Sequence, residues 1–388
     1  MPDRLGELAL TASLVQPPVR TAVDGVAEPA AGWVATAPAG AGPLALVRHA
    51  SHRSVRRARR PRGTRTVPLR PPVMRPSLRT AVRGWLASGV AIVDADFPAP
   101  GSPMAAVAGQ AGVRFPSVAL WLGSGGVLVA PALMGRLPVM LRVFPPGTGE
   151  GHAHAVSTLT RLRGLAGQGL VPALHGSGRT DGLDWLVETR LAGTRPRRLT
   201  QRLASEAVDF TSTLPLPPGP VVGAEQRLPQ VLDAGTADRL AAVGRAASSC
   251  WSGVPAVGTH GDLWLGNLLA DHGALSGVVD WDAYRGDVVP GLDLVHLLAT
   301  EERLRQRRSM GAELLSRPWE REPLRSLGRR YFSALGVHLD EDRWTATGNA
   351  WWLGQVASTL TRTPALARDA RWMQANVVSV LDVVEHRG

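Results

Sequence analysis

Four side chains that could carry chemistry lie within one short segment of this 388-residue chain. Residues 259–282 read THGDLWLGNLLADHGALSGVVDWD and contain His260, Asp262, Asn267 and Asp280, in a chain with only three asparagines and ten histidines. A carboxylate such as Asp262 can accept the proton of a hydroxyl group. Oxygen donors such as Asn267 and Asp280 suit a hard cation such as Mg²⁺. The segment therefore predicts proton transfer beside a metal ion, provided that the local elements bring these side chains together.

A β-hairpin is the element that would do so. We expect a glycine-containing turn, an apolar strand over residues 267–270, a tight Asp-His-Gly turn and a return strand over residues 274–281. Because neighbouring strands lie about 5 Å apart, Asn267 comes opposite residues 278–280 and can share one Mg²⁺ with Asp280.

Asp262 then lies close to this pair and could orient an acceptor hydroxyl in a phosphoryl transfer. His260, two residues earlier, is expected to brace the turn. The alternative is a purely structural set, in which His260 and Asp262 are turn residues, Asn267 is a cap and Asp280 ends a strand.

The composition limits the class of protein. With 388 residues and 44% hydrophobic content, the chain can bury a substantial core and divide into two or more domains. A single cysteine, Cys250, excludes an intrachain disulfide framework and fits a reducing compartment. The first ten residues, MPDRLGELAL, lack the features of a secretory signal, so a cytoplasmic location is expected.

The positive charge is concentrated at the N-terminus. All 43 basic side chains are arginine, residues 1–80 have a net charge of +9, and residues 81–388 have only +2. Residues 1–73 are rich in Arg, Pro and Ala and are predicted to be a disordered tail. This tail is either a solvated extension or the product of a start site placed too far upstream, with Met74 as the true first residue. Weak contact with nucleic acid through this tail is a further interpretation, but its arginine block contains no aromatic residue for base stacking, so nucleic-acid binding is not expected.

The remaining chain predicts an α+β protein with two lobes. After a predicted helix at 76–88, strand-like runs and one helix at 153–166 fill a nucleotide-binding lobe at 74–193, and mostly helical patterns fill a lobe at 194–388. Residues 115–135 carry no charge and are long enough to span a membrane. Their two prolines and central GSGG favour two strands around a turn, so no membrane span is expected.

The catalytic segment resembles a known family. HGDLWLGN, followed by VVDWD and GDVVPGLDL, is similar to the phosphotransfer core of the aminoglycoside phosphotransferase and choline kinase family, which has the protein-kinase-like fold. The resemblance covers about residues 115–385 and implies Asp262 as the catalytic base, with Asn267 and Asp280 as the Mg²⁺ ligands. His260 belongs to the same catalytic turn. The resemblance further implies supporting roles for three acids, of which Asp293 is placed to cap a helix beginning at Leu294; the other two are Asp282 and Asp287.

The resemblance also implies ATP as the cofactor. A glycine turn formed by Gly123, Ser124, Gly125 and Gly126 would face its phosphates, although ordinary hairpin turns have the same composition. Arg142, in PVMLRVF, would replace the strand lysine of the family, or would be an ordinary strand arginine facing solvent. The run LVETRL, with Glu188 and Arg190, resembles the connector whose backbone binds adenine; it also fits a plain buried strand.

One departure from the family leaves two functions open. The helix at 153–166 contains no acid to pair with the strand cation; Ala155 stands where one is expected, and only Glu150 lies nearby. The intact catalytic turn favours a phosphotransferase that uses Mg²⁺ and ATP to phosphorylate a hydroxyl group of a small molecule. The missing acid favours a non-catalytic nucleotide-binding or scaffold protein with a kinase-like fold.

The charge of the second lobe bears on the acceptor. Residues 301–330 contain nine arginines and five acids, which disfavours a polycationic aminoglycoside and favours a neutral or anionic hydroxylated molecule, such as a sugar or a glycosylated natural product. Tryptophans are numerous beyond residue 300 and could stack on sugar rings or simply pack in the core; they are Trp319, Trp344, Trp351, Trp352 and Trp372. The acceptor's identity, the choice of ATP or GTP, and the oligomeric state have no signature in the sequence.

Overall fold

The computed structural model describes residues 90–92, 101, 103–115, 119–122, 127–215, 223 and 228–386. The expected tail, the helix at 76–88 and the glycine turn at 123–126 lie outside these residues. The chain divides into two compact units. The sheet unit comprises the described residues up to Arg163 together with Pro172–Leu191, and the helical unit comprises Gly164–Val171 and the described residues from Ala192 onward.

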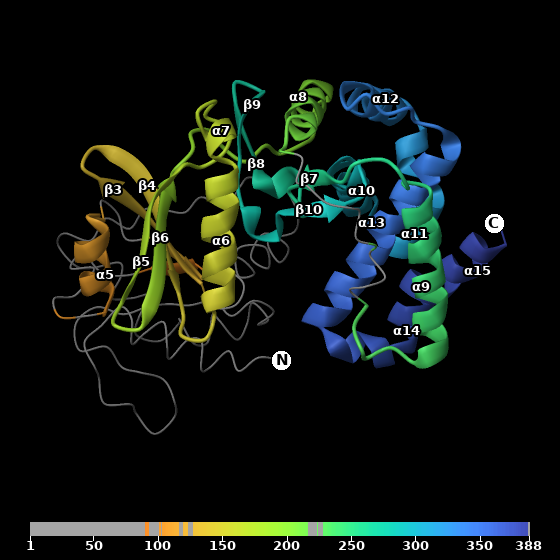
Figure 1. Ribbon diagram of the computed structural model, residues 1–388, viewed down its shortest axis with the longest axis horizontal. Coiled ribbons are helices and arrows are strands. Elements are labelled where there is room, and N and C mark those ends of the chain that lie inside the picture. Colours follow the sequence, from red (N-terminus) through yellow and green to blue (C-terminus); the bar gives the residue numbers. More distant parts are fainter. Residues whose placement is uncertain are drawn as a thin grey trace. The chain divides into compact units, whose positions relative to one another are not determined.

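The sheet unit is built on an antiparallel sheet in the order β1-β2-β3-β4-β6-β5. Its strands are β1 (Val90–Ile92), β2 (Ala119–Leu122), β3 (Leu128–Met134), β4 (Leu137–Phe144), β5 (Leu174–Thr180) and β6 (Leu183–Thr189), and its helices are α5 (Pro103–Ala111) and α6 (Gly149–Arg161). The short α7 (Arg163–Ala166) follows α6 and, after its first residue, belongs to the helical unit. The expected strands at β2, β3, β4 and β6 and the expected helix at α6 are present. The two helices lie on opposite faces of the sheet (Figure 1).

Alternation along β4 assigns its side chains to these two faces. Val139, Leu141 and Val143 are fully buried and pack with α5, whereas Phe144 packs with α6. Because successive side chains of a strand point to opposite faces, Arg142 lies on the α6 face. The uncharged run at 115–135 thus contributes β2 and β3, and no helix among the described residues is long and apolar enough to cross a membrane.

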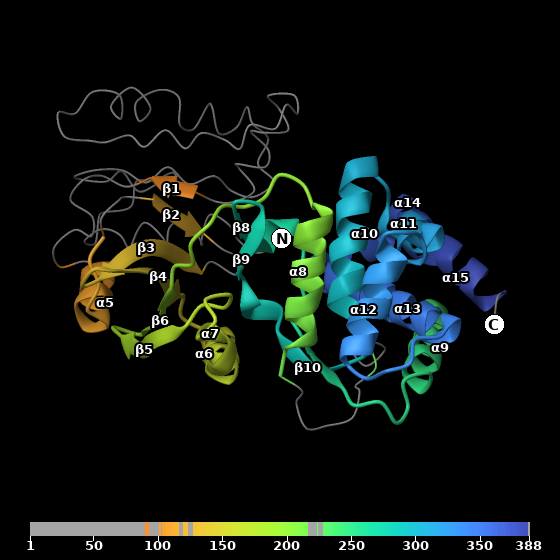
Figure 2. The same ribbon diagram turned by 90° about the horizontal axis from the view of Figure 1, so that it is seen from above.

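The helical unit contains two small antiparallel sheets, β7 (Val257–Thr259) with β10 (Arg285–Val288) and β8 (Leu268–Asp271) with β9 (Ala274–Val278). Figure 2 shows its helices gathered around α10 and α13. The longer helices are α8 (Gln201–Ser212), α9 (Ala234–Ser249), α10 (Leu292–Gln306), α12 (Leu324–Ala334) and α13 (Glu341–Arg362). The shorter ones are η3 (Leu265–Asn267), η4 (Trp281–Ala283), α11 (Met310–Ser316), η5 (Pro318–Glu320), η6 (Pro364–Arg368), α14 (Ala370–Met373), the π-helical η7 (Gln374–Val378) and α15 (Ser379–Glu385).

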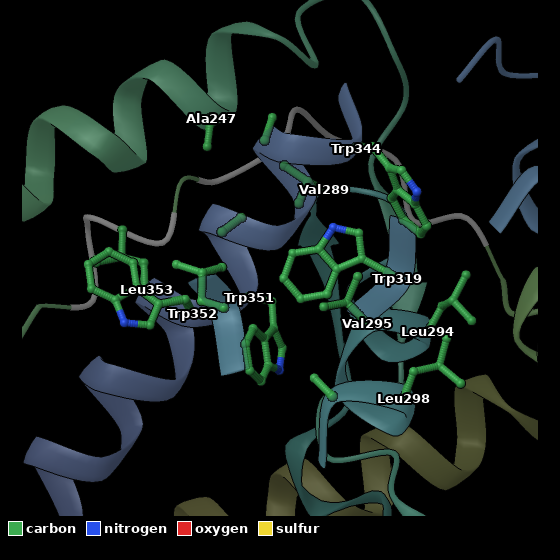
Figure 3. Close-up of a cluster of buried hydrophobic side chains, with 14 of the residues drawn as sticks. Ala247, Val289, Leu294, Val295, Leu298, Trp319, Trp344, Trp351, Trp352 and Leu353 are labelled. Atoms are coloured by element: carbon green, nitrogen blue, oxygen red, sulfur yellow. The ribbon is translucent and has the colours of Figure 1, made fainter. Parts of the chain in front are cut away.

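Tryptophan side chains fill the core of the helical unit (Figure 3). Trp319 and Trp351 meet edge to face with ring centroids 6.1 Å apart. Gly348 permits this contact, because a Cβ at that position would overlap the Trp319 ring. Of the five tryptophans considered as ligand-stacking groups, four are at most 4% exposed and serve as core; these are Trp319, Trp344, Trp351 and Trp352. Trp372 is half-buried and packs against the same cluster.

Candidate active site

The turn that carries Asp262 is fixed by a glycine. Gly261 has φ +81°, a left-handed conformation that residues with a side chain rarely adopt. A Cβ at this position would also overlap the backbone oxygen of Ala283. The glycine of the HGD segment is therefore required both by the backbone angle and by the close approach of η4.

A buried carboxylate from α10 ties the turn in place. Asp293 Oδ2 accepts the backbone N–H of His260 at 2.6 Å, and its Oδ1 accepts the N–H of Gly261 at 2.9 Å. The expectation that Asp293 caps the helix is wrong: α10 begins at Leu292, the capping position is Gly291, and the Asp293 side chain is directed to the turn. Burial raises the pKa of Asp293, and the hydrogen bonds from the backbone N–H groups of His260 and Gly261 oppose that increase.

His260 braces the same turn from the other side. Its side chain is fully buried, with Nε2 2.9 Å from the carbonyl oxygen of Val279 and its ring packed on Trp281 at a centroid distance of 4.6 Å. Nδ1 lies 3.3 Å from the backbone nitrogen of Asp262 and accepts its N–H. These contacts fit the bracing role expected of His260, because its ring joins the turn to the segment that precedes Asp280.

Asp262 and Asn267 are in direct contact. The Asn267 amide nitrogen donates to the backbone oxygen of Asp262 at 2.9 Å and to its carboxylate Oδ2 at 3.3 Å. Since the amide nitrogen is used in this way, the Asn267 side-chain oxygen faces away from Asp262 and is the atom that a hard cation would take. The side chain of Asp262 is 49% exposed, so its carboxylate remains accessible.

The β8–β9 hairpin places Asp280 near Asn267. Val279 donates its N–H to the Asn267 backbone carbonyl at 2.9 Å, one step beyond the Leu268–Val278 pair. The return strand ends at Val278 and not at residue 281 as expected, because Asp280 turns the chain with φ +69° into η4. A left-handed aspartate is a strained conformation that is common at functional sites. No cluster of three or more His, Cys, Asp or Glu side chains suited to a metal occurs among the described residues, so a cation here would rely on one carboxylate and one amide.

Two further residues complete this site: His296, which the sequence interpretation missed, and Trp351, which it considered only as a stacking or core residue. His296 Nε2 lies 3.2 Å from Asp262 Oδ1, and the Trp351 indole nitrogen lies 3.1 Å from His296 Nδ1. A signal was present in the sequence: Asp293, His296 and Thr300 form a polar stripe at helical spacing in the otherwise apolar run LDLVHLLAT. All three are buried, which a solvated helix face would not be.

The environment of Asp262 keeps its carboxylate ionised. Desolvation raises its pKa, but the hydrogen bond from His296 and the positive potential of neighbouring groups, Arg362 among them, outweigh this effect, and the net pKa lies below the ordinary value. A half-exposed, ionised carboxylate with both oxygens oriented is suited to accept a proton from a bound hydroxyl group.

The predicted nucleotide residues lie in the sheet unit. Arg142 is 7% exposed on β4, and its guanidinium carbon lies 5.3 Å from the centre of the Phe144 ring. Glu188, on β6, is half-buried, and Arg190 is exposed just after β6 and donates its backbone N–H to the Pro138 carbonyl. Gly123, Ser124, Gly125 and Gly126 lie outside the described residues.

Helix α6 begins at Gly149 and not at residue 153 as expected, so it includes Glu150, and it packs against the sheet. Ala155 is 3% exposed and packs in a cluster with Phe144 and Leu186. Glu150 is exposed in the first turn of α6. His152, on the same helix, meets the Phe144 ring edge-on, and its Nε2 lies 3.1 Å from the Trp185 carbonyl oxygen. A carbonyl oxygen is only an acceptor, so His152 Nε2 donates this hydrogen bond.

A two-unit α+β chain with a Gly-Asp turn, a following asparagine and a hairpin aspartate is the arrangement expected of a phosphotransferase. The sequence profile described as the phosphotransferase enzyme family matches residues 127–327. This match spans more than half of the chain, and the chain belongs to that family of phosphotransferases. A comparison with curated proteins gives no significant match.

Solved structures of several kinases and phosphotransferases are similar to this chain. An aminoglycoside phosphotransferase from Streptomyces rimosus, in complex with ADP and streptomycin, is 16% identical over 65% of this chain and 97% of its own, with a TM-score of 0.40. A macrolide 2'-phosphotransferase from Brachybacterium faecium is 16% identical over 70% and 96%, with a TM-score of 0.42. An ethanolamine kinase from Plasmodium vivax is 11% identical over 66% and 76%, with a TM-score of 0.41. At these low values, the family assignment rests on the sequence profile alone.

Proposed function

We propose that the chain transfers the γ-phosphoryl group of ATP, in the presence of Mg²⁺, to a hydroxyl group of a small molecule. The observation that carries the proposal is the Asp262 carboxylate, which is half-exposed, has a lowered pKa, and is held by His296 on one oxygen and Asn267 on the other. In the transfer, the acceptor O–H proton moves to Asp262 as the acceptor oxygen bonds to the γ-phosphorus. The bond between that phosphorus and the bridging oxygen breaks, and its electrons leave with ADP.

Asn267 and Asp280 would hold the metal. The Asn267 amide nitrogen is engaged with Asp262, which leaves its side-chain oxygen for a cation, and Asp280 follows directly after the residue that pairs with Asn267. One amide and one carboxylate form a donor set that suits Mg²⁺, whose other positions are usually filled by water and substrate phosphates. When bound, the ion would neutralise negative charge on the phosphate oxygens.

The acceptor is expected to be neutral or anionic. Three of the acids between residues 301 and 330 are neutralised by arginines in the pairs Arg305–Glu302, Arg317–Glu320 and Arg329–Glu322. Of the remaining two, Glu313 is fully buried and Glu301 is half-buried with a pKa raised by desolvation. This segment therefore offers little free negative charge to a polycationic acceptor, which supports a sugar-like or natural-product hydroxyl compound.

Substitution of Asp262 tests the proposal. Asp262→Ala and Asp262→Asn should lower kcat about 10²- to 10⁴-fold, the usual contribution of a positioned base, while calorimetric binding of Mg-ATP is retained. Asp271→Asn is the matched control, because Asp271 lies at the exposed tip of the same hairpin. Turnover is followed by mass spectrometry of a pool of hydroxylated metabolites, and unchanged turnover in the Asp262 variants would reject the assigned base.

A non-catalytic nucleotide-binding protein is the second candidate, favoured by the buried Ala155 at the position where an acid is expected. Such a protein would gain stability on binding Mg-ATP, by about 2.7 kcal/mol at a ligand concentration about 100 times the dissociation constant, without consuming ATP. ATP consumption that depends on an added acceptor would exclude this candidate.

A further inference from the structure

His296 joins the catalytic turn to the longest helix of the helical unit. Its side chain is 9% exposed and lies between Asp262 Oδ1, at 3.2 Å from Nε2, and the Trp351 indole nitrogen, at 3.1 Å from Nδ1. Thr300 Oγ1 lies 3.4 Å from the same Nδ1 atom. Both ring nitrogens are therefore engaged, one with the reacting carboxylate and the other with the core.

The chemistry of tryptophan decides where the ring proton of His296 lies. An indole N–H can only donate a hydrogen bond, so His296 Nδ1 must accept it with its lone pair. The single proton of the ring is then on Nε2, which donates to Asp262. The Thr300 hydroxyl does not conflict with this assignment, because its hydrogen can rotate toward or away from Nδ1.

We infer that His296, held in the Nε2–H form by Trp351, is a positioning residue that fixes the plane of the Asp262 carboxylate toward the acceptor hydroxyl. His296 holds Oδ1 and Asn267 holds Oδ2, so rotation of the carboxylate breaks at least one hydrogen bond. This inference rests on the proposed function for its catalytic consequence, but the position of the ring proton is independent of it.

The same hydrogen bonds exclude a role for His296 in relaying the proton that Asp262 accepts. Its Nε2 already carries a proton, and its Nδ1 faces a donor, so the ring has no site that can take the proton collected by Asp262. That proton must leave through the exposed side of the carboxylate, since the Asp262 side chain is 49% exposed. His296 thus orients the base and does not accept its proton.

Three variants and one control separate positioning from simple packing. His296→Leu removes the donor to Asp262, whereas His296→Gln places an amide N–H near the Nε2 position. Trp351→Phe keeps an aromatic ring against Trp319 but removes the donor to Nδ1. Trp352→Phe is the matched control, because it is the same change at the next position of α13, where the lost hydrogen bond goes to Asn376 at 2.8 Å and not to His296.

The first readout is catalytic. His296→Leu should lower kcat about 100-fold, the effect of a misplaced reacting group, with an unchanged KM for ATP. His296→Gln should recover most of that loss, because it restores the donor to Oδ1. Thermal unfolding of each variant verifies folding. Equal kcat in His296→Leu and the wild type would overturn the inference, as would equal kcat losses in the Leu and Gln variants.

The second readout is the ¹⁵N spectrum of the imidazole and needs no acceptor. The wild type should show a pyridine-type Nδ1 and a pyrrole-type Nε2 for His296, as should Trp352→Phe. In Trp351→Phe the two signals should move toward each other as the proton gains access to both nitrogens. A pyrrole-type Nδ1 in the wild type would overturn the assignment. If the wild type transferred no phosphate to any acceptor, the proposed function would fall, and the spectrum would still support or overturn the Nε2–H form.

Discussion

At the residue scale, the left-handed glycine of the turn at residues 260–262 has a counterpart at the tip of the following hairpin. Gly261 and Gly273 have φ values of +81° and +80°. An added Cβ at Gly261 would meet the Ala283 backbone, whereas one at Gly273 would meet nothing within 4 Å. Substituting each glycine by alanine therefore distinguishes two contributions to the loss of stability. The backbone angle contributes at both positions, whereas steric overlap contributes only at Gly261.

Substitution of both glycines should therefore give unequal losses. Gly273→Ala should lower the free energy of unfolding by about 1 kcal/mol through the backbone angle. Gly261→Ala should lower it by about 3 kcal/mol and reduce kcat, because the turn must move away from Ala283 and takes Asp262 with it. Chemical denaturation and steady-state kinetics measure both effects. Equal destabilisation of the two variants would contradict the assigned overlap.

Arg142 provides a second prediction at this scale. Its buried guanidinium lies over the Phe144 ring, an arrangement that favours a planar cation and fixes the direction of its N–H groups. If it contacts nucleotide phosphate, Arg142→Ala should weaken ATP binding about tenfold or more, equivalent to about 1.4 kcal/mol. Arg136→Ala, at the exposed β3–β4 turn, removes the same charge without this packing and should leave ATP affinity unchanged. Calorimetric titration distinguishes the two variants, and equal affinities would remove Arg142 from the nucleotide site.

At the element scale, local sequence patterns predict the β8–β9 hairpin but fail for elements whose structure is decided by tertiary packing. The Asp-His-Gly turn and its flanking apolar runs predict β8 and β9, because the interacting residues are close in sequence. Strand β5 is missed because LHGSGRT is mostly polar and lies at the sheet edge. Helix α13 shows no clear amphipathic period, since residues on most of its sides are buried in the tryptophan-rich core.

The same distinction applies to the candidate site. His260, Asp262 and Asn267 could be grouped from spacing alone, because one turn contains them. His296 and Trp351 could not, since they reach Asp262 only through the packing of α10 against α13, in contacts that join residues 34 and 55 positions apart along the chain. The misassigned role of Asp293 has the same cause: the N–H groups that donate to it belong to a turn supplied by another part of the chain.

Helix α11 carries a carboxylate whose titration should affect stability. Glu313 is fully buried, and neither carboxylate oxygen has a hydrogen-bond partner in the part of the chain that is described. Desolvation raises its pKa from 4.5 to about 7, and the charges around it are Arg308, Glu302, Arg303 and Arg321. The folded state therefore retains this proton up to about pH 7, whereas the unfolded chain releases it near pH 4.5.

Between pH 4.5 and about pH 7, folding therefore takes up a proton at Glu313. The free energy of unfolding should fall as the pH rises through this range. The expected loss is up to about 3 kcal/mol relative to Glu313→Gln, which cannot ionise. Glu341→Gln, at an exposed position, should leave the pH dependence unchanged. Denaturant unfolding from about pH 4.5 to about pH 8 measures the difference, and parallel curves for the wild type and Glu313→Gln would show that Glu313 does not titrate with a raised pKa.

At the scale of the whole molecule, the chain has two units with separate cores. Aliphatic side chains of β3, β4 and α5 form one core of the sheet unit, and tryptophans of η5 and α13 dominate that of the helical unit. The charge is also divided unevenly, since residues 81–388 have a net charge of only +2 while residues 301–330 alone have +4. The helical unit that carries Asp262 is therefore locally basic in this segment.

This charge distribution predicts that the protein uses a neutral acceptor better than a positively charged one. An amino sugar and its N-acetylated form share a ring and its hydroxyl groups but differ by one positive charge. Four of the five acids of residues 301–330 are paired with arginine or buried, and the fifth, Glu301, is half-buried. Because Arg362 also adds positive potential at Asp262, the neutral form should be the better acceptor. We expect its kcat/KM to be about tenfold higher at low salt, with the difference shrinking as salt screens the charge. A higher kcat/KM for the cationic form at every salt concentration would contradict this prediction. The acceptor would then be positively charged, and an acidic surface outside residues 301–330 would be needed to bind it.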